Sequence, residues 1–423
     1  MLVIMKELKR VAITGLGISC GLGQNLKEVW ANAIEGKPGV SLIEQLNTEN
    51  LAVKIAGEVK NFQLSNDILP EKEHARYDRF IHLGLHSTDE AIKDAGFERK
   101  DWKGYDPKKV GCILGVGMGG FPFIEAQHSI YLERGPRRVS PFFIPSIIPN
   151  MASGLITIQY DMKGINYTIA SACASAAHAI STAAMEIQTG RHEVMITGGT
   201  ESVLSDMTIM GFANMKALSR RNDEPEKASR PFDLGRDGFI MGEGAGIIVL
   251  EDYDKAKARG AKIYAEVVGH GSSSDAYHIT APHPEGLGAF ECMKASLEMA
   301  DIKPEQVGYI NAHGTSTPLG DIGETNAIKK AFGDHAYNLH VSSTKSMTGH
   351  LLGAAGGIES VFCAMALHTG DLPPTINLDN QDPECDLNYI ANKSIKKQVD
   401  YALNNSFGFG GTNCSLILKR EGV

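Results

Sequence analysis

Short apolar runs alternate with helix-like patterns along nearly the whole chain, and this alternation constrains the fold most. Each run is only four or five residues long. Apolar runs of this length between helices are typical of βαβ units in buried, largely parallel sheets, so we predict an α/β fold. The predicted strands cover residues 11–15, 110–114, 194–197, 246–250, 264–268, 307–311 and 340–343. The clearest predicted helices cover residues 25–35, 87–95, 288–300, 321–332 and 351–367.

The rhythm of strands and helices starts again near residue 260. This restart is compatible with two similar halves, although no sequence identity between them is strong enough to prove a repeat. No linker is long enough to separate independent domains. We predict a division into residues 1–258 and 259–423.

Composition narrows the class of protein. The chain has 423 residues and a formal net charge of -9, which argues against a general nucleic-acid binder. An acidic partner is still compatible with this charge if basic residues gather in one patch. No run approaches the ~20 apolar residues that span a bilayer. The apolar run at the start of the chain is too short for a signal peptide. Met5 is an alternative initiator to Met1.

The seven cysteines are an odd number and contain no CxxC pair. That pattern favours neither a disulfide framework nor a zinc site, and it suits a reducing compartment. We therefore predict a cytoplasmic protein with no metal site.

Cys173 is the strongest candidate for a chemical role. It lies where a β-prone run beginning at Tyr167 gives way to small residues that can open a helix. A cysteine at the start of a helix lies near the positive end of the helix dipole, which favours the thiolate. His313 and His350 each lie in a segment rich in Gly, Ser and Thr beside an apolar run. A thiol and two histidines make a plausible nucleophile with charge-stabilising partners.

A glycine-rich segment, residues 115–120, matches the G-x-G-x-x-G pattern after a predicted strand. A single match is a weak signal, and no clear helix start follows it. The chain contains no G-x-x-x-x-G-K-[ST] motif. The sequence therefore does not predict nucleotide binding.

Six segments together resemble the β-ketoacyl-acyl-carrier-protein synthases of the thiolase superfamily, most closely the type II synthases of bacterial fatty acid elongation. The resemblance runs from Val11 almost to the last residue. It implies a thiolase-like α/β fold of two pseudo-equivalent halves in five α-β-α-β-α layers, usually as a homodimer. The segments cover residues 229–233, 237–246, 274–278, 311–318, 343–356 and 405–413.

The activity implied by this resemblance is a decarboxylative Claisen condensation. Cys173 would carry the acyl chain as a thioester, and His313 and His350 would donate hydrogen bonds to the enolate oxygen formed from malonyl-acyl-carrier-protein. That role requires neutral imidazoles, and the apparent helix start at His350 favours neutrality through the helix dipole. Lys345, paired with Glu359, would support the site electrostatically. The backbone N–H groups of Cys173 and Phe409 would bind the second oxyanion, and Phe409 would act as a gate.

The resemblance also implies the binding residues and partners. Phosphopantetheine would arrive on the acyl carrier protein, so no resident cofactor is expected. An acidic enzyme needs a local basic surface to bind an acidic carrier protein. The expected substrate contacts are Met118 at the far end of the acyl chain, Phe212, Phe407, Thr280 near the phosphopantetheine arm, and Thr315 and Thr317 near the malonyl carboxylate. The expected carrier-protein contacts are Lys72, Arg76, Arg137, Arg138 and Lys216.

Related enzymes provide the alternatives. A thiolase uses a second cysteine as base, and the loop at 407–411 contains none. An initiating type III synthase carries Cys-His-Asn, whereas His350 supplies a second histidine here. A type I elongating synthase or a polyketide condensing enzyme stays open, because both use Cys-His-His. A chain-length factor, which is a binding subunit, lacks the nucleophile that Cys173 supplies.

Overall fold

The protein is represented by a computed structural model in which residues 8–423 are described, so the choice between Met1 and Met5 lies outside the described residues. One ten-stranded sheet dominates this part of the chain, in the order β10-β9-β13-β14-β8-β1-β7-β6-β4-β5. Two small hairpin-like pairs, β2–β3 and β11–β12, lie outside it. The strands are β1 Val11–Ser19, β2 Ser41–Leu42, β3 Ile55–Ala56, β4 Val110–Gly115, β5 Asn166–Ile169, β6 Val194–Glu201, β7 Gly244–Asp252, β8 Ala265–Ser274, β9 Val307–Asn311, β10 His340–Ser342, β11 Asp371–Leu372, β12 Ile395–Lys396, β13 Tyr401–Gly408 and β14 Thr412–Arg420.

The sheet consists of two halves with the same topology. The strand order in the first half is β1-β7-β6-β4-β5. The β1–β7 and β7–β6 pairs are antiparallel, and the β6–β4 and β4–β5 pairs are parallel. In the second half, β8-β14-β13-β9-β10 repeat that series. The halves join through a short antiparallel contact of Ala12 and Ile13 in β1 with Glu266 and Ala265 in β8. Two pseudo-equivalent halves are thus confirmed. The boundary between residues 258 and 259 stays a prediction.

The strands are less parallel than the sequence predicts. β7 and β14 run antiparallel to both of their neighbours, so the prediction of largely parallel sheets is wrong. The physical reason is that a strand buried on both faces is a continuous apolar run in either direction. All nine residues of β7 are buried, and its sequence carries no sign of its direction.

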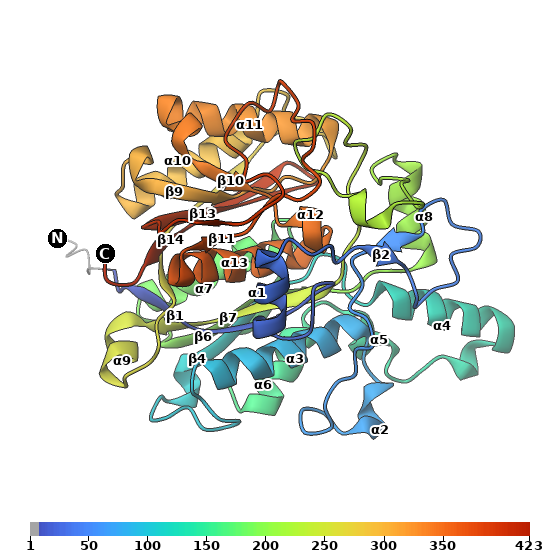
Figure 1. Ribbon diagram of the computed structural model, residues 1–423. Helices are drawn as coiled ribbons and strands as arrows, with labels where there is room; N and C mark the ends of the chain where they lie inside the picture. Colours follow the sequence, from blue (N-terminus) through green and yellow to red (C-terminus); the bar gives the residue numbers. More distant parts are fainter. Residues whose placement is uncertain (1–7) are drawn as a thin grey trace.

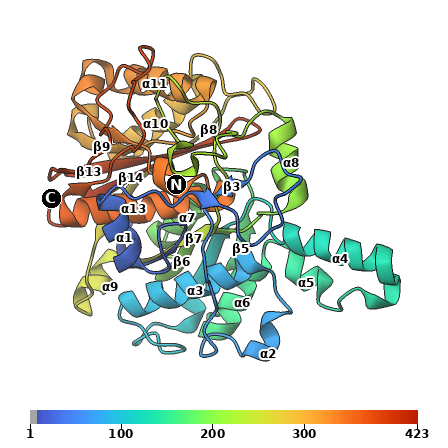
Figure 2. The ribbon, with the colours of Figure 1, turned by 45° about the vertical axis from the view of Figure 1, so that its right-hand side comes forward.

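Helices complete five layers (Figures 1 and 2). α3 and α6 cover the outer face of the first half, α10 and α11 cover the outer face of the second, and α7 and α13 lie between the two. The predicted α-β-α-β-α order is confirmed. Within residues 8–423, no helix is both long and apolar enough to cross a membrane. The helices are α1 Leu26–Ile34, α2 Glu71–His74, α3 Arg79–Asp94, α4 Phe121–Arg134, α5 Phe143–Ile147, α6 Met151–Tyr160, α7 Ser175–Gln188, α8 Asp206–Asn214, α9 Tyr253–Ala258, α10 Leu287–Ala300, α11 Pro318–Phe332, α12 Lys345–Thr348 and α13 Ala355–Thr369.

Several helix starts differ from the sequence-based expectation. α3 begins at Arg79, well before the predicted start at Ser87, and α11 begins at Pro318 rather than Asp321. α4 begins at Phe121, directly after the glycine-rich segment, where no helix start is predicted. Gly120 occupies the cap position without a side-chain hydrogen bond, so the usual Ser, Thr, Asp or Asn signal is missing. α13 begins at Ala355 rather than at Leu351, because residues Leu352–Ala354 form a 3-10 turn.

The central layer depends on close approach between helix and strand. α13 packs against β7 and β6 of one half and against β13 of the other. A Cβ atom built on Gly246 of β7 would lie 2.2 Å from the backbone nitrogen of Ile358 in α13. Only glycine fits at that crossing, and the contact fixes how the middle helix sits on the sheet.

Gly246→Ala should therefore lower the free energy of unfolding by roughly 2–3 kcal/mol, because the backbone of α13 must move to admit the methyl group. Gly211→Ala is the matched control. Gly211 lies in α8, and no neighbour lies within 4 Å of the position that an added methyl group would take, so alanine should leave stability unchanged or raise it by about 1 kcal/mol. Urea unfolding of the three proteins measures the difference. Equal stability of Gly246→Ala and the wild type would contradict this packing.

Candidate active site

Cys173 lies in the turn between β5 and α7, as the sequence predicts. Ala172 adopts a left-handed conformation with φ of 48°, an uncommon and strained state for a residue other than glycine. The Ser175 hydroxyl holds the turn: it accepts the Ser171 N–H at 2.8 Å and donates to the Ala172 carbonyl at 2.6 Å. This strained turn places the Cys173 side chain against a cavity of about 660 Å³.

The cavity lies where the two halves meet, beyond the carboxyl ends of equivalent strands. Met118 follows β4 and Cys173 follows β5 in the first half, whereas His313 follows β9 and His350 comes after β10 in the second. Side chains gather at this end of parallel strands in α/β sheets generally. The predicted residues that line the cavity are Met118, Cys173, Phe212, Lys216, Thr280, His313, Thr315, Thr317, His350, Phe407 and Phe409.

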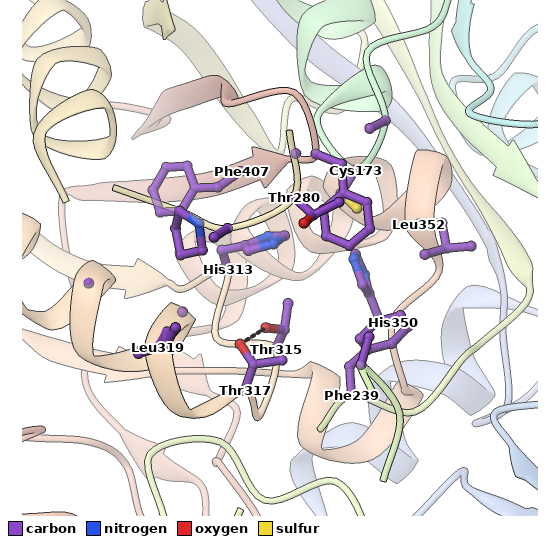
Figure 3. Close-up of a pocket in the computed structure, with 18 of the residues that line it drawn as sticks. Cys173, Phe239, Thr280, His313, Thr315, Thr317, Leu319, His350, Leu352 and Phe407 are labelled. Atoms are coloured by element: carbon purple, nitrogen blue, oxygen red, sulfur yellow. Dashed lines mark hydrogen bonds between the residues drawn. The ribbon is translucent and has the colours of Figure 1, made fainter. Parts of the chain in front are cut away.

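The two imidazoles face the same space as the thiol (Figure 3). The ring centroids of His313 and His350 are 5.3 Å apart, and the ring planes are nearly perpendicular at 86°. The His350 backbone N–H donates to the Ile240 carbonyl at 2.7 Å. Glu324 of α11 accepts the His313 and Gly314 N–H groups at 2.8 and 2.7 Å. These backbone contacts fix the position of both rings.

Burial lowers the pKa of His313 and of His350 well below the ordinary value, and the positive charge of Lys345 lowers both further. Both imidazoles are therefore neutral at pH 7 and can donate an N–H hydrogen bond. The predicted cause, a helix dipole at His350, is wrong. α12 ends at Thr348 and α13 starts at Ala355, so His350 is not at a helix start.

Lys345 and Glu359 form a buried ion pair behind the cavity, as expected from the sequence. The residues are 1% and 0% exposed, so both charges are removed from water. Burial raises the pKa of Glu359 to about 7, and the Lys345 ammonium opposes that rise. Lys345 does not line the cavity, and it acts on the histidines through its field.

Opposing influences act on the ionisation of the Cys173 thiol. Burial raises the pKa of Cys173 to about 12, while the Lys345 ammonium and the nearby Phe409 backbone N–H act in the opposite direction. Burial therefore opposes the effect of the position before α7, and it favours the neutral thiol. The expected helix contribution to the thiolate fraction stays a prediction.

The expected carrier-protein contacts do not gather around the cavity. Lys216 lines it, at a left-handed φ of 57° just after α8. Lys72 is exposed on α2, and Arg137 and Arg138 are exposed in the turn Pro136–Arg138. The Arg76 guanidinium lies 4.8 Å from the ring centroid of Phe142, beside that turn. Four of the five residues thus lie away from the cavity, and their role stays a prediction.

Two buried carboxylates escape sequence reasoning. Glu324 supports the backbone at His313, and Glu201 supports the segment around Met118. Glu201 contacts residues more than 80 positions away, and Glu324 follows His313 on the next helix, α11; no motif in the sequence marks either carboxylate. No group of three or more His, Cys, Asp or Glu side chains within residues 8–423 could hold a metal ion.

Comparison with known proteins gives a consistent family. The family model described as "Beta-ketoacyl synthase, N-terminal domain" matches residues 8–256, and "Beta-ketoacyl synthase, C-terminal domain" matches residues 264–379. The chain is 49% identical over 414 residues to 3-oxoacyl-[acyl-carrier-protein] synthase 2 of Synechocystis sp., covering 98% of this chain and 99% of the relative. It is 47% identical over 416 residues to the Staphylococcus aureus protein of that name, with the same coverage.

Solved structures agree with the sequence matches. A β-ketoacyl synthase from Burkholderia phymatum superposes with a TM-score of 0.89 at 34% identity, covering 98% of this chain and all of that one. A ketosynthase solved in complex with its type II polyketide acyl-carrier protein matches with a TM-score of 0.89 at 32% identity, covering 98% and 99%. With nearly full-length matches in sequence and structure, the chain belongs to the β-ketoacyl synthase family.

Proposed function

We propose that the protein catalyses the decarboxylative Claisen condensation of an acyl group on Cys173 with malonyl-acyl-carrier-protein. The products are a 3-oxoacyl-acyl-carrier-protein two carbons longer and CO₂, as in fatty acid elongation. One observation carries the proposal: Cys173, His313 and His350 line the same cavity from opposite halves of the fold. The names of relatives at 47–49% identity support the same reaction.

The first step is acyl transfer. The Cys173 sulfur attacks the thioester carbonyl of the acyl carrier protein, the old C–S bond breaks, and the departing phosphopantetheine sulfur takes the thiol proton. Burial raises the pKa of the Cys173 thiol, and we propose that deprotonation accompanies attack. The Phe409 backbone N–H lies near the sulfur, and with the Cys173 N–H it would bind the oxyanion.

The second step is decarboxylation of the malonyl group. The bond to the carboxylate breaks, CO₂ leaves, and the electron pair forms an enolate whose negative oxygen lies between the neutral His313 and His350. Hydrogen bonds preorganised toward developing charge stabilise the transition state most in a desolvated site. Thr315 and Thr317, joined by a 3.0 Å hydrogen bond, lie on the same cavity wall near the expected carboxylate position.

Condensation completes the reaction. The enolate carbon attacks the Cys173 thioester, the new C–C bond forms, and the sulfur leaves and takes up a proton. Phe409 is 36% exposed and its ring centroid is 6.4 Å from that of Phe212, at the cavity wall. Gly410 and Gly411 follow with φ of 85° and 70°, a conformation suited to glycine. We assign Phe409 the role of gate, and no resident cofactor takes part.

The acyl chain would extend past Phe212 toward Met118, and Phe407 and Thr280 would border the entering phosphopantetheine arm. Phe407 packs against His313 with ring centroids 5.5 Å apart. Met118 lies at the edge of the apolar cluster that includes Leu352 and Ile209. A flexible methionine at that position suits a pocket that must admit chains of different length.

The proposed partners are acyl carrier protein and a second copy of this chain. A ketosynthase of similar structure was solved with its acyl-carrier protein. β5 is the last strand of the sheet, and Ile158 and Met185 on the neighbouring α6 and α7 are 67% and 39% exposed. An open strand edge flanked by apolar side chains suits pairing with a second copy. The seven free cysteines suit the proposed cytoplasmic location.

The polyketide alternative has weaker support. The similar type II polyketide ketosynthase is 32% identical, and a ketosynthase solved with its chain length factor is 28% identical. Both values are below the 47–49% of the relatives named 3-oxoacyl-[acyl-carrier-protein] synthase 2. A non-catalytic chain-length factor would have no need of the strained turn at Cys173 or of two buried neutral imidazoles.

Cys173→Ala should form no acyl adduct with acyl-carrier-protein, whereas His313→Ala and His350→Ala should acylate Cys173 but decarboxylate malonyl-carrier-protein slowly. Loss of one oxyanion donor typically costs ~3 kcal/mol, roughly a hundredfold in rate. Intact-mass analysis and CO₂ release measure the two steps separately. Cys363→Ala, at a buried thiol in α13 away from the cavity, is the control and should keep its adduct. An adduct on Cys173→Ala, or wild-type decarboxylation by either histidine variant, would refute the assigned roles.

Arg137→Glu should raise KM for acyl-carrier-protein and weaken the salt dependence of kcat/KM, with kcat nearly unchanged, because surface charge acts on encounter. The control is Lys294→Glu, a charge reversal at an exposed residue of α10 that is not among the expected carrier-protein contacts. Steady-state kinetics at several salt concentrations measure the effect. If kcat/KM fell equally for a small acyl thioester without the carrier protein, Arg137 would instead contribute to the shape of the active site.

A further inference from the structure

Glu201 is a buried carboxylate that the proposed chemistry does not use. It ends β6, is 0% exposed, and lies on the wall of the active-site cavity. It forms no salt bridge within residues 8–423, although a buried carboxylate is costly unless its oxygens are satisfied. Its partners are instead backbone N–H groups from two separate segments.

Four backbone donors converge on this one carboxylate. From the segment after β4, the N–H groups of Gly117, Met118 and Gly119 donate at 2.7, 3.2 and 3.2 Å. From the turn after His350, the Gly353 N–H donates at 3.2 Å. Burial raises the pKa of Glu201 to about 7, and these four N–H groups oppose the rise.

The glycine-rich segment therefore has a physical explanation. Its consecutive N–H groups form the kind of cradle that binds a phosphate in nucleotide sites, but the chain's own carboxylate occupies it. Close approach demands glycine at two places. A Cβ on Gly117 would lie 2.6 Å from Glu201 Oε2, and a Cβ on Gly353 would lie 2.5 Å from the same oxygen and 2.2 Å from the Gly117 nitrogen.

This arrangement links two parts of the cavity wall. The Met118 backbone N–H donates to the Glu201 carboxylate. Gly353, which donates to the same carboxylate, is three residues beyond His350 and adjacent to Leu352, another residue that lines the cavity. Resting on the function proposed above, we propose that Glu201 is a positioning residue that sets the depth of the acyl pocket. It does so by clamping residues 117–119, and with them Met118, against the turn that contains Gly353.

Glu201→Gln keeps the size of the side chain, removes its charge and replaces one of its two acceptor oxygens by an NH₂ donor. Gly117 and Gly353 donate to Oε2, Gly119 donates to Oε1, and Met118 lies near both oxygens. Either orientation of a glutamine amide therefore points its NH₂ group at two backbone donors. The clamp should loosen and Met118 should give way to longer chains. Because one added two-carbon unit buries two CH₂ groups, the ratio of kcat/KM for long to short acyl-carrier-protein primers should rise about tenfold.

Glu251→Gln is the matched control. Glu251 is also 0% exposed and lies in the paired strand β7, at the end remote from Glu201, where Arg259 and Tyr105 bind it. The Glu251→Gln protein should be less stable than the wild type, but its kcat/KM should depend on acyl chain length as in the wild type. Gly117→Ala, which pushes a methyl group at the Glu201 carboxylate, is a second route to the same change if Glu201→Gln does not fold.

The outcomes separate the clamp from the proposed function. A wild-type protein that elongates no acyl-carrier-protein would refute the function itself. With an active wild type, a change of the same size at all chain lengths in Glu201→Gln would refute the clamp. Glu201 also raises the pKa of Cys173, and the loss of that effect is independent of chain length. A changed profile in Glu251→Gln would equally assign the effect to general loss of stability.

Discussion

The buried ion pair between Lys345 and Glu359 is the interaction on which the site depends. Two charges removed from water are stable only as partners, and breaking such a pair typically costs ~3–5 kcal/mol. The pair connects α12 to α13 beneath the cavity. Its ammonium lowers the pKa of both histidines and opposes the rise in the pKa of Cys173. The Lys345 charge thus adds to burial in keeping the two imidazoles neutral, and it keeps the thiol closer to ionisation than burial alone would.

The pseudo-symmetry of the fold explains why these groups meet. β4 and β5 are equivalent to β9 and β10, and each of the four is followed by a loop that supplies a site residue. The first half contributes the thiol and the acyl-pocket wall, and the second contributes both imidazoles and the lysine. Within residues 8–423, α7 and α13 of the central layer contact strands of both halves, so their packing sets the distance between nucleophile and donors.

The sequence predicts features that depend on neighbouring residues, and it misses features that depend on contacts between distant segments. The turn at Cys173 is predictable because a β-prone run, small residues and a helix follow one another directly. The restart near residue 260 is compatible with two similar halves, and the resemblance to the family implies their five layers. The thiol state is not predictable, because burial of Cys173 depends on residues from both halves. The partner of the glycine-rich segment is not predictable either: Glu201 is more than 80 residues away from Gly117, and nothing near either residue marks the contact.

The electrostatics have a consequence for stability. In the unfolded chain the two imidazoles take up protons below about pH 6.5, whereas in the folded protein they stay neutral. The site therefore lowers the stability of the protein as the pH falls below that value. Desolvation that favours catalysis at neutral pH is thus unfavourable in acid.

Neutrality of His313 and His350 is the central claim, and nitrogen NMR of the histidine-labelled protein tests it directly. Spectra of the His313→Ala and His350→Ala variants assign the two rings. We expect both rings to keep the chemical shifts of neutral imidazole from pH 8 down to pH 5. Titration of either ring to imidazolium with a pKa near the ordinary value of about 6.5 would contradict this account of the site.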